Sequence, residues 1–283
     1  MPYTPIEYVV DNNLYGLAYW LKKYTNFEGK IDGFIEYWLF LGNYVKKESI
    51  LSFTNSIITF GNRRKEHLIH GGVKKKIHTI GPYIHYAQPI LIDDKFIALK
   101  KELGKVLLVF PSHSIKNLES NYAIDKFVNE IEAIKKDFDN VLICMYFIYI
   151  QNLKLTQMYK NKGYKIVTAG HLYDFNFLAR LKSIIMLSDY TLSNSPGTHV
   201  GYCIFLKKAH YIFNQDITQS GNNLKEINLR DEIETKSLIK EQKELIDCFA
   251  SYNPNTIADE QIKLVNELWG VAQLKKIKSS KEY

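Results

Sequence analysis

The residues best suited to chemistry lie in one polar segment, Ser193 to His199, with the sequence Ser-Asn-Ser-Pro-Gly-Thr-His. The segment separates a predicted strand from a predicted helix, and the free N–H groups and dipole at a helix N-terminus favour a bound phosphate. The glycine permits a close backbone approach, and the hydroxyls can donate hydrogen bonds. The alternative is a loop that only caps the helix. We expect a phosphate-bearing ligand to bind Asn194, Ser195, Gly197, Thr198 and His199.

Two further polar loops follow predicted strands in the same half of the chain. The loop Ser112-His113-Ser114 follows a strand predicted over Lys105 to Phe110, and His171 follows one predicted over Lys165 to Thr168. Ligands of parallel sheets bind at the carboxyl ends of the strands. These residues are therefore predicted to line the same site, although each could instead be a structural cap. A metal site is disfavoured, because no carboxylate or cysteine stands at a helpful spacing.

The first half of the chain offers two candidates for a general base, Glu36 and His85. Each follows a predicted strand and could face the cleft between two halves, where a base would take the proton of a reacting hydroxyl. The alternative is structural, with Glu36 exposed or ion-paired and His85 packed among tyrosines.

Other motifs argue against familiar classes of enzyme. The pair Asp137 and Asp139 has the spacing of a metal-binding Asp-x-Asp motif, but it ends a predicted helix instead of following a strand, which indicates a helix end and turn. The sequence contains no phosphate-binding P-loop, no Gly-x-Gly-x-x-Gly and no Gly-x-Ser-x-Gly. P-loop ATPases, ordinary dehydrogenases and typical esterases are therefore disfavoured.

Strand and helix patterns alternate along the chain, which predicts an α/β fold with mostly parallel sheets. Strands are expected within Ile31 to Phe40, where a turn follows the strand that Glu36 closes, and over Ser56 to Phe60 and Val141 to Tyr149, among others. The second half of the chain contains about five βα units in sequence, which is the pattern of a doubly wound nucleotide-binding domain. We predict an N-terminal lobe over residues 1–95, a C-terminal lobe over 104–255, and a final helix with a basic tail over 256–283 that packs back across the cleft.

The overall charge and the cysteines restrict the setting of the protein. The formal net charge of +7 is scattered in short runs, as on a solvated surface, or as on a protein that meets an anionic membrane or a polyphosphate. Zinc-finger spacing and RNP-like aromatic motifs are absent, so nucleic acid is the weakest partner. The three cysteines show no disulfide framework, and the first ten residues do not resemble a secretory signal. We therefore expect a cytoplasmic protein, with peripheral contact at the inner face of the plasma membrane as a further possibility.

Several strings resemble those of bacterial surface-polysaccharide glycosyltransferases with the GT-B architecture, which belong to capsule and lipopolysaccharide gene clusters. They lie in Thr168–Gly170, Phe177–Leu181, Ser188–Tyr190, Ser193–Ser195, Gly197–Tyr202 and Thr79–Ala87. The resemblance implies two Rossmann-like lobes, with a nucleotide-sugar donor in the C-terminal lobe and an acceptor near the N-terminal lobe. It also implies that no metal or cofactor is needed. The N-terminal lobe is reduced, and Tyr37 stands beside Glu36 where such proteins carry a histidine.

The resulting hypothesis is a glycosyltransferase that moves a sugar from a nucleotide sugar to a glycan or lipid-linked acceptor, with Glu36 or His85 as the base. Two alternatives stay open. One is a nucleotide-sugar epimerase, or another transferase, on the same fold. The other is a non-catalytic nucleotide-binding partner of a glycan assembly complex, which the short first lobe motivates.

Overall fold

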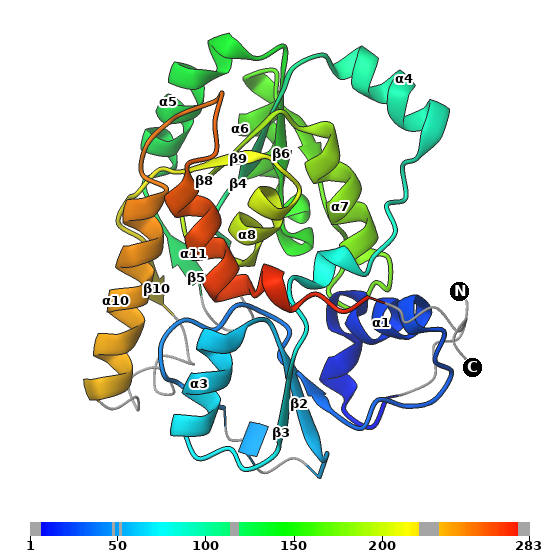
Figure 1. The fold of residues 1–283 in the computed structure, drawn as a ribbon. Coiled ribbons are helices and arrows are strands. Elements are labelled where there is room, and N and C mark those ends of the chain that lie inside the picture. Colours follow the sequence, from blue (N-terminus) through cyan, green and yellow to red (C-terminus); the bar gives the residue numbers. More distant parts are fainter. Residues whose placement is uncertain (1–6, 47–48, 51–52, 114–118, 221–231, 277–283) are drawn as a thin grey trace.

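The computed structural model describes residues 7–46, 49–50, 53–113, 119–220 and 232–276, and it shows two lobes, each built on a parallel sheet (Figure 1). The predicted α/β fold with two Rossmann-like lobes is confirmed. The N-terminal lobe has three strands in the order β1-β2-β3, with bounds β1 Phe34–Ile35, β2 Ser56–Thr59 and β3 Lys76–Thr79. Three short strands make this the smaller lobe, as the sequence predicted.

The C-terminal lobe contains a five-stranded sheet in the order β7-β6-β4-β8-β9, in which every pair is parallel. The chain starts in the middle of the sheet, moves out through two strands, and then returns to the other side of β4. The strand order therefore reverses between β4 and β8, which is where ligands bind in doubly wound sheets. The bounds are β4 Val106–Phe110, β6 Asn140–Cys144, β7 Lys165–Val167, β8 Tyr190–Ser193 and β9 Ala209–Ile212.

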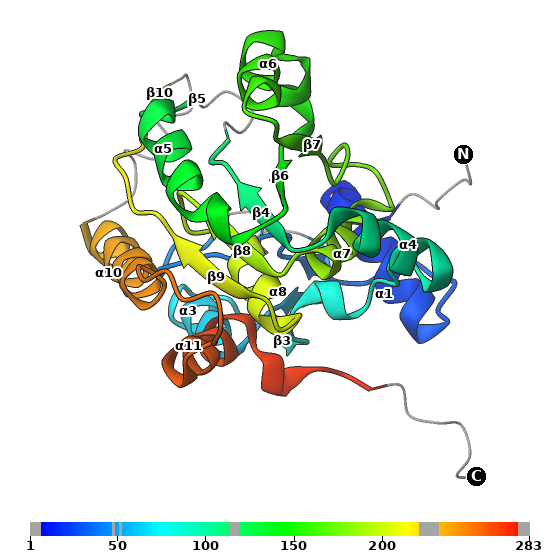
Figure 2. The ribbon, with the colours of Figure 1, turned by 90° about the horizontal axis from the view of Figure 1, so that it is seen from above.

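Helices cover both faces of the larger sheet (Figure 2). Side chains of β4 alternate between the faces: Leu108 packs in one hydrophobic cluster with α7 and α8, and Leu107 in another with α5 and α6. Because both faces are covered, all five residues of β4 are buried, as the apolar run predicted. The helices are α5 Ile124–Ile134, α6 Leu153–Asn161, α7 Phe177–Leu187 and α8 Thr198–Phe205.

The remaining elements lie at the ends and joints of the lobes. The N-terminal lobe begins with a 3-10 helix, Val10–Gly16, and also carries α1 and α3, while α4 lies in the connection between the lobes and projects from the body (Figure 1). An antiparallel two-stranded ribbon joins β5 to β10. The bounds are α1 Leu17–Thr25, α3 Asn62–His70, α4 Asp93–Leu103, β5 Glu119–Asn121, β10 Thr218–Ser220, α10 Glu232–Cys248 and α11 Asp259–Trp269.

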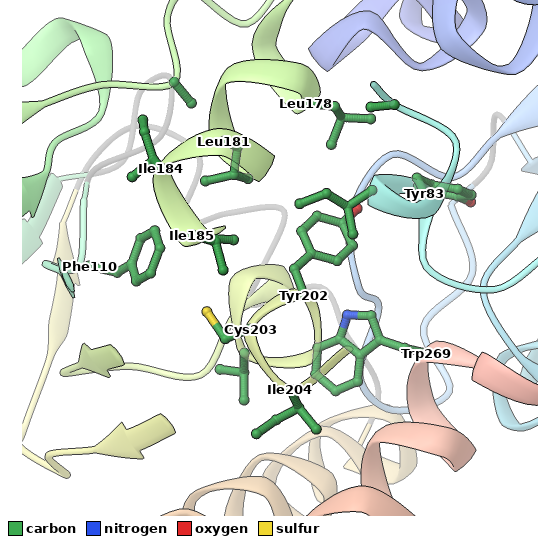
Figure 3. Close-up of a cluster of buried hydrophobic side chains, with 14 of the residues drawn as sticks. Tyr83, Phe110, Leu178, Leu181, Ile184, Ile185, Tyr202, Cys203, Ile204 and Trp269 are labelled. Carbon is green, nitrogen blue, oxygen red and sulfur yellow. The ribbon is translucent and has the colours of Figure 1, made fainter. Parts of the chain in front are cut away.

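A single hydrophobic core crosses the boundary between the lobes. Tyr83 from the N-terminal lobe, Tyr202 from α8 and Trp269 at the end of α11 belong to one buried cluster (Figure 3). The indole N–H of Trp269 donates to the carbonyl oxygen of Thr198 at 3.1 Å, and Gly270 lies against Gly61 of the N-terminal lobe. Helix α11 therefore contacts both lobes and fixes them against each other.

Across the described ranges, none of the helices combines the length and the apolar character that a membrane span requires.

Candidate functional site

The carboxyl ends of β4 and β8 lie side by side and bring two of the predicted loops together; this junction, where doubly wound sheets bind their ligands, is here called the crevice. The backbone N–H of Ser112, which follows β4, donates to the side-chain oxygen Oδ1 of Asn194, which follows β8, at 2.6 Å. Asn194 is only 1% exposed, and its amide nitrogen Nδ2 has no hydrogen-bond partner. An unpaired buried donor costs about 1–3 kcal/mol, so an acceptor oxygen that reached this atom, from water or from a ligand, would be stabilising. Sequence reasoning placed both residues correctly at one edge.

The N-terminus of α8 lies at the same junction, a few residues after β8 ends. Its N-cap residue, Gly197, is extended and makes no side-chain cap hydrogen bond. The N–H of Val200 donates to the carbonyl of Gly197 at 3.1 Å, while the N–H groups of Thr198 and His199 precede the first helical hydrogen bond. These two donors, together with the helix dipole, favour an anion at this point.

Thr198 has a different environment from the one predicted. Its hydroxyl Oγ1 accepts the backbone N–H of Leu39 in the N-terminal lobe at 3.0 Å, and its carbonyl accepts the indole N–H of Trp269. The residue therefore joins the two lobes at the edge of the crevice. Its hydroxyl can still donate its own proton to a ligand while accepting from Leu39.

His199 lies beside the anion position and is uncharged. Its ring stacks on Phe110 at 4.7 Å between centroids, and its Nε2 atom is buried without a partner. Burial, with a smaller contribution from His113, lowers the pKa of His199 to about 3. A neutral imidazole of this kind can donate or accept a single hydrogen bond, but it supplies no positive charge to a phosphate.

A chain of aromatic rings forms the rim of the crevice beyond β4, β6 and β7. His113 stacks on Tyr146 at 4.5 Å, and Phe147 contacts the ring of His171 at 4.3 Å. His171 is exposed, and its Nδ1 accepts the N–H of Tyr173 at 3.1 Å, so a neutral ring carries its proton on Nε2. The structure thus brings His113 and His171 to one rim, as predicted. Ser114 lies outside the described residues.

Sequence reasoning missed the two aromatic residues of this rim. Tyr146 and Phe147 contact each other at 4.6 Å and lie just after the carboxyl end of β6, which stops at Cys144. The prediction of one strand over Val141 to Tyr149 was wrong in its second half, because Phe147–Gln151 forms a 3-10 helix. The signal in the sequence is the aromatic cluster Tyr-Phe-Ile-Tyr itself.

The opposite side of the crevice is formed by the segment 37–46 of the N-terminal lobe, here called the 37–46 loop. The Nζ atom of Lys46 lies 4.5 Å from the ring of Trp38 and donates to the hydroxyl of Tyr37 at 2.9 Å. Tyr37 is 6.2 Å from the ring of Tyr15, and burial, followed by the proximity of Tyr146 and Tyr37, raises the pKa of Tyr15. Aromatic side chains from both lobes therefore meet at the crevice.

Glu36 is enclosed in a buried ion pair. Its carboxylate, 0% exposed, accepts from Nε and Nη2 of Arg64 at 2.9 and 2.5 Å and from the hydroxyl of Thr59 at 2.8 Å. Arg64 also donates to the carbonyl of Tyr44 at 2.8 Å, which anchors the 37–46 loop. Its role as a general base stays a prediction, and this arrangement is the ion-paired alternative.

His85 is packed among aromatic rings at the connection between the lobes. Its ring lies 4.9 Å from Tyr86 and 5.9 Å from Phe205, and its Nε2 is 3.4 Å from the hydroxyl of Tyr24. Burial, assisted by the nearby Lys182, lowers the pKa of His85. A catalytic role for His85 stays a prediction, and its surroundings match the structural alternative.

Within the part of the chain that the structure describes, no cluster of three or more His, Cys, Asp or Glu side chains is arranged to hold a metal ion. The predicted helix end at Asp137 and Asp139 is confirmed: a 3-10 turn ends at Asp137, whose carboxylate accepts from the hydroxyl of Tyr252 at 2.9 Å. The carboxylate of Asp139 accepts the backbone N–H of Lys105 at 2.7 Å, so both residues have structural partners.

No family model and no curated protein matches the sequence. The structure is similar to that of UDP-GlcNAc 2-epimerase from Methanocaldococcus jannaschii, solved with UDP-GlcNAc and UDP, with 14% identity, a TM-score of 0.43, and coverage of 75% of this chain and 60% of that one. The corresponding enzyme from Neisseria meningitidis, bound to UDP-GlcNAc, gives 14% identity, a TM-score of 0.40, and coverage of 83% and 68%. The S. aureus MnaA–UDP structure gives 13% identity, a TM-score of 0.40, and coverage of 88% of this chain and 70% of that one. The chain thus spans less than two thirds of the length of the first of these enzymes.

Proposed function

We propose that the protein is an enzyme that binds a nucleotide sugar in the crevice between β4 and β8, with the diphosphate at the N-terminus of α8. The observation that carries this proposal is the buried, unpaired Nδ2 of Asn194 at the point where the strand order reverses. A diphosphate would supply acceptor oxygens to Nδ2 and to the first N–H groups of α8. The neutral His199 would add one uncharged hydrogen bond.

The aromatic residues around this position suit the remainder of such a ligand. The rings of His113 and Tyr146 stack on each other on the C-terminal lobe, and Tyr37 packs beside Tyr15 on the N-terminal lobe. Flat rings of this kind can stack on a nucleobase or on the apolar face of a sugar. The arrangement supports a ligand with a planar or ring-shaped group attached to its phosphates.

Sugar transfer to a glycan or lipid-linked acceptor is the first candidate for the reaction, and it requires a base for the acceptor hydroxyl. Both predicted bases are engaged: Glu36 by Arg64 and Thr59, and His85 by its aromatic neighbours. A second candidate is epimerisation of the nucleotide sugar, which needs no acceptor hydroxyl but does need a group that removes a proton from the sugar ring. Among the described residues of the crevice, the imidazoles of His113 and His171 are able to move a proton in either reaction.

Ligand-induced thermal stabilisation tests the binding site. UDP, GDP, CDP, CMP, dTDP and ADP would be screened; a ligand that binds only the folded state adds about 2.7 kcal/mol of stability at a hundredfold excess over its Kd. Asn194→Asp keeps the oxygen that accepts from Ser112 but replaces the Nδ2 donor by an anion, so it should abolish the shift. Asn253→Asp is the matched control, because Asn253 also accepts a backbone N–H, from Asn255, and lies beside Tyr190 at the opposite end of β8. If none of the nucleotides raised the melting temperature of the wild-type protein, the proposal would be overturned.

Product analysis then separates the candidate reactions. The nucleotide sugar of the identified nucleotide is incubated with the protein alone and followed by NMR. A new epimer, or hydrolysis of the donor without an acceptor, supports epimerisation. Consumption only when a glycan acceptor is present supports transfer. Binding without turnover under both conditions supports the non-catalytic alternative.

A further inference from the structure

His210 on β9 lies directly behind the candidate site and has no place in the function proposed above. It is 1% exposed, and both of its ring nitrogens contact hydroxyl groups on the neighbouring strand β8. Nδ1 lies 2.7 Å from Oγ1 of Thr191, and Nε2 lies 3.0 Å from Oγ of Ser193. Each hydroxyl also has a carbonyl acceptor: Thr191 reaches Ala209 at 2.9 Å, and Ser193 reaches Ser195 at 2.8 Å.

The hydrogens available to this group do not suffice for all four contacts. Burial, and to a smaller extent His199, lowers the pKa of His210 well below its ordinary value, so the ring is neutral and carries one N–H. The two hydroxyls supply one hydrogen each. Three hydrogens therefore serve four contacts, and the tautomer of His210 decides which contact goes without one.

The two tautomers have different consequences for the crevice. With the proton on Nε2, His210 donates to Ser193, and the Ser193 hydroxyl is free to donate to the carbonyl of Ser195. With the proton on Nδ1, the ring nitrogen Nε2 and the carbonyl of Ser195 compete for the same hydroxyl hydrogen. Only the first arrangement secures the turn from Ser193 to Ser195, which contains Asn194.

We infer that His210, protonated on Nε2, is a positioning residue that acts through Ser193 to hold the loop 193–197 in its ligand-binding shape. The hydrogen bond from Ser193 to Ser195 closes a tight turn around Asn194. Because the turn is fixed, the Oδ1 of Asn194 reaches the N–H of Ser112 and its Nδ2 stays available for the ligand. The inference rests on the proposed function for the identity of the ligand, but not for the state of the loop.

The first test needs no ligand. Side-chain ¹⁵N chemical shifts of the imidazoles in the wild-type protein give the tautomer of His210 directly, and Ser193→Ala identifies the resonance by its shift. We expect a proton on Nε2. A proton on Nδ1 would overturn the inference even if no variant of His210 could be purified.

The second test uses two variants that each retain one end of the ring's hydrogen bonding. His210→Gln extends an amide to the position of Nε2 and can still donate to Ser193, whereas His210→Asn reaches only the position of Nδ1, near Thr191. We expect backbone hydrogen exchange at Asn194, Ser195, Gly197 and Thr198 (Pro196 has no N–H) to rise about tenfold in the Asn variant, as for the loss of one hydrogen bond, and to change little in the Gln variant. The affinity for the nucleotide found by thermal shift should follow the same order.

A double variant with Ser193→Ala distinguishes positioning from packing. If His210 acts through Ser193, His210→Asn adds no further exchange or loss of affinity once the hydroxyl of Ser193 is removed. Equal losses in the Gln and Asn variants, or additive losses with Ser193→Ala, would show a merely structural histidine. If the wild-type protein binds no nucleotide at all, the proposed function fails, while the exchange and tautomer measurements still decide this inference.

Discussion

The hydroxyl of Thr198, at the first position of α8, accepts the backbone N–H of Leu39 in the 37–46 loop at 3.0 Å. This bond joins the helix that offers its N-terminus to a ligand with the loop that forms the opposite side of the crevice. The carbonyl of the same threonine accepts from Trp269 on α11. Three segments that are distant in sequence thus meet at one residue, and a change there reaches both the site and the joint between the lobes.

Thr198→Ala should lower the free energy of unfolding by about 1 kcal/mol, because the partly buried N–H of Leu39 loses its acceptor. Thr198→Ser keeps the hydroxyl and should stay close to the wild type, which makes it the matched control. Urea denaturation at neutral pH measures both. An alanine variant as stable as the serine variant would show that water replaces the bond without cost.

Glu36→Gln should lower stability by about 3–5 kcal/mol, because it leaves the guanidinium of Arg64 buried without its counter-charge. The side chains of both residues are at most 3% exposed, so water cannot compensate. Glu66→Gln, an exposed substitution on the same helix as Arg64, is the control and should have little effect. Denaturant unfolding with far-UV detection gives the difference. A loss of activity at unchanged stability would instead support the predicted catalytic role of Glu36.

Much of the fold followed from local sequence patterns. The apolar run that became β4 lacks polar residues over five positions, which only a strand covered on both faces tolerates. The placement of Ser112 beside Asn194 followed as well, because carboxyl ends of parallel strands lie at one edge whatever the details of the chain between them.

What the sequence could not provide are the contacts between residues far apart in the chain. The strand predicted within Ile31 to Phe40 ends at Ile35, with Glu36 at its close as expected, but its partners were not predicted: Glu36 pairs with Arg64, and the 37–46 loop leaves the sheet to reach Thr198. No local pattern marks those two contacts. The role of His210 could not be predicted either. Its polar partners lie on β8, and they become its neighbours only because β8 and β9 pair in the folded sheet.

Stability should depend on the charge of Glu241, which joins α10 to the N-terminal lobe. Its carboxylate accepts from Nε2 of His67 at 3.2 Å and from the N–H of Gly42 at 2.7 Å. Burial alone would raise the pKa of Glu241, but these hydrogen bonds outweigh it and hold the pKa below its ordinary value of 4.5. A lowered pKa in the folded state means that the stabilisation is complete above about pH 4.5 and is lost as the pH falls through the lower, folded-state value.

The comparison of wild type with Glu241→Gln between pH 7 and pH 3 tests this sign. We expect the wild type to be the more stable at pH 7 and the difference to shrink toward pH 3. Asp247→Asn, which removes an exposed ion pair with Lys243 on the same helix, should show little difference at either pH. A difference that is constant over the whole range would contradict the assignment.

The contact between Gly201 on α8 and the indole of Trp269 should tolerate no added side chain. A Cβ atom on Gly201 would lie 2.1 Å from the Trp269 ring, and both residues are buried. Gly201→Ala therefore forces the indole away from α8, and overpacking of this kind typically costs about 1–3 kcal/mol. The displacement should also break the bond from the indole N–H to Thr198, which leaves two buried polar groups unpaired.

Trp269→Phe separates these two effects, because it keeps an aromatic ring against Gly201 and removes only the N–H. We expect a loss of about 1 kcal/mol from the missing hydrogen bond, plus the effect of the smaller ring, and less than the loss in Gly201→Ala. Denaturant unfolding of both variants ranks them. Because Trp269 also positions the first turn of α8 through Thr198, Gly201→Ala should weaken nucleotide binding more than its loss of stability alone accounts for. If both variants bind the nucleotide as tightly as the wild type, the joint between the lobes and the site are independent.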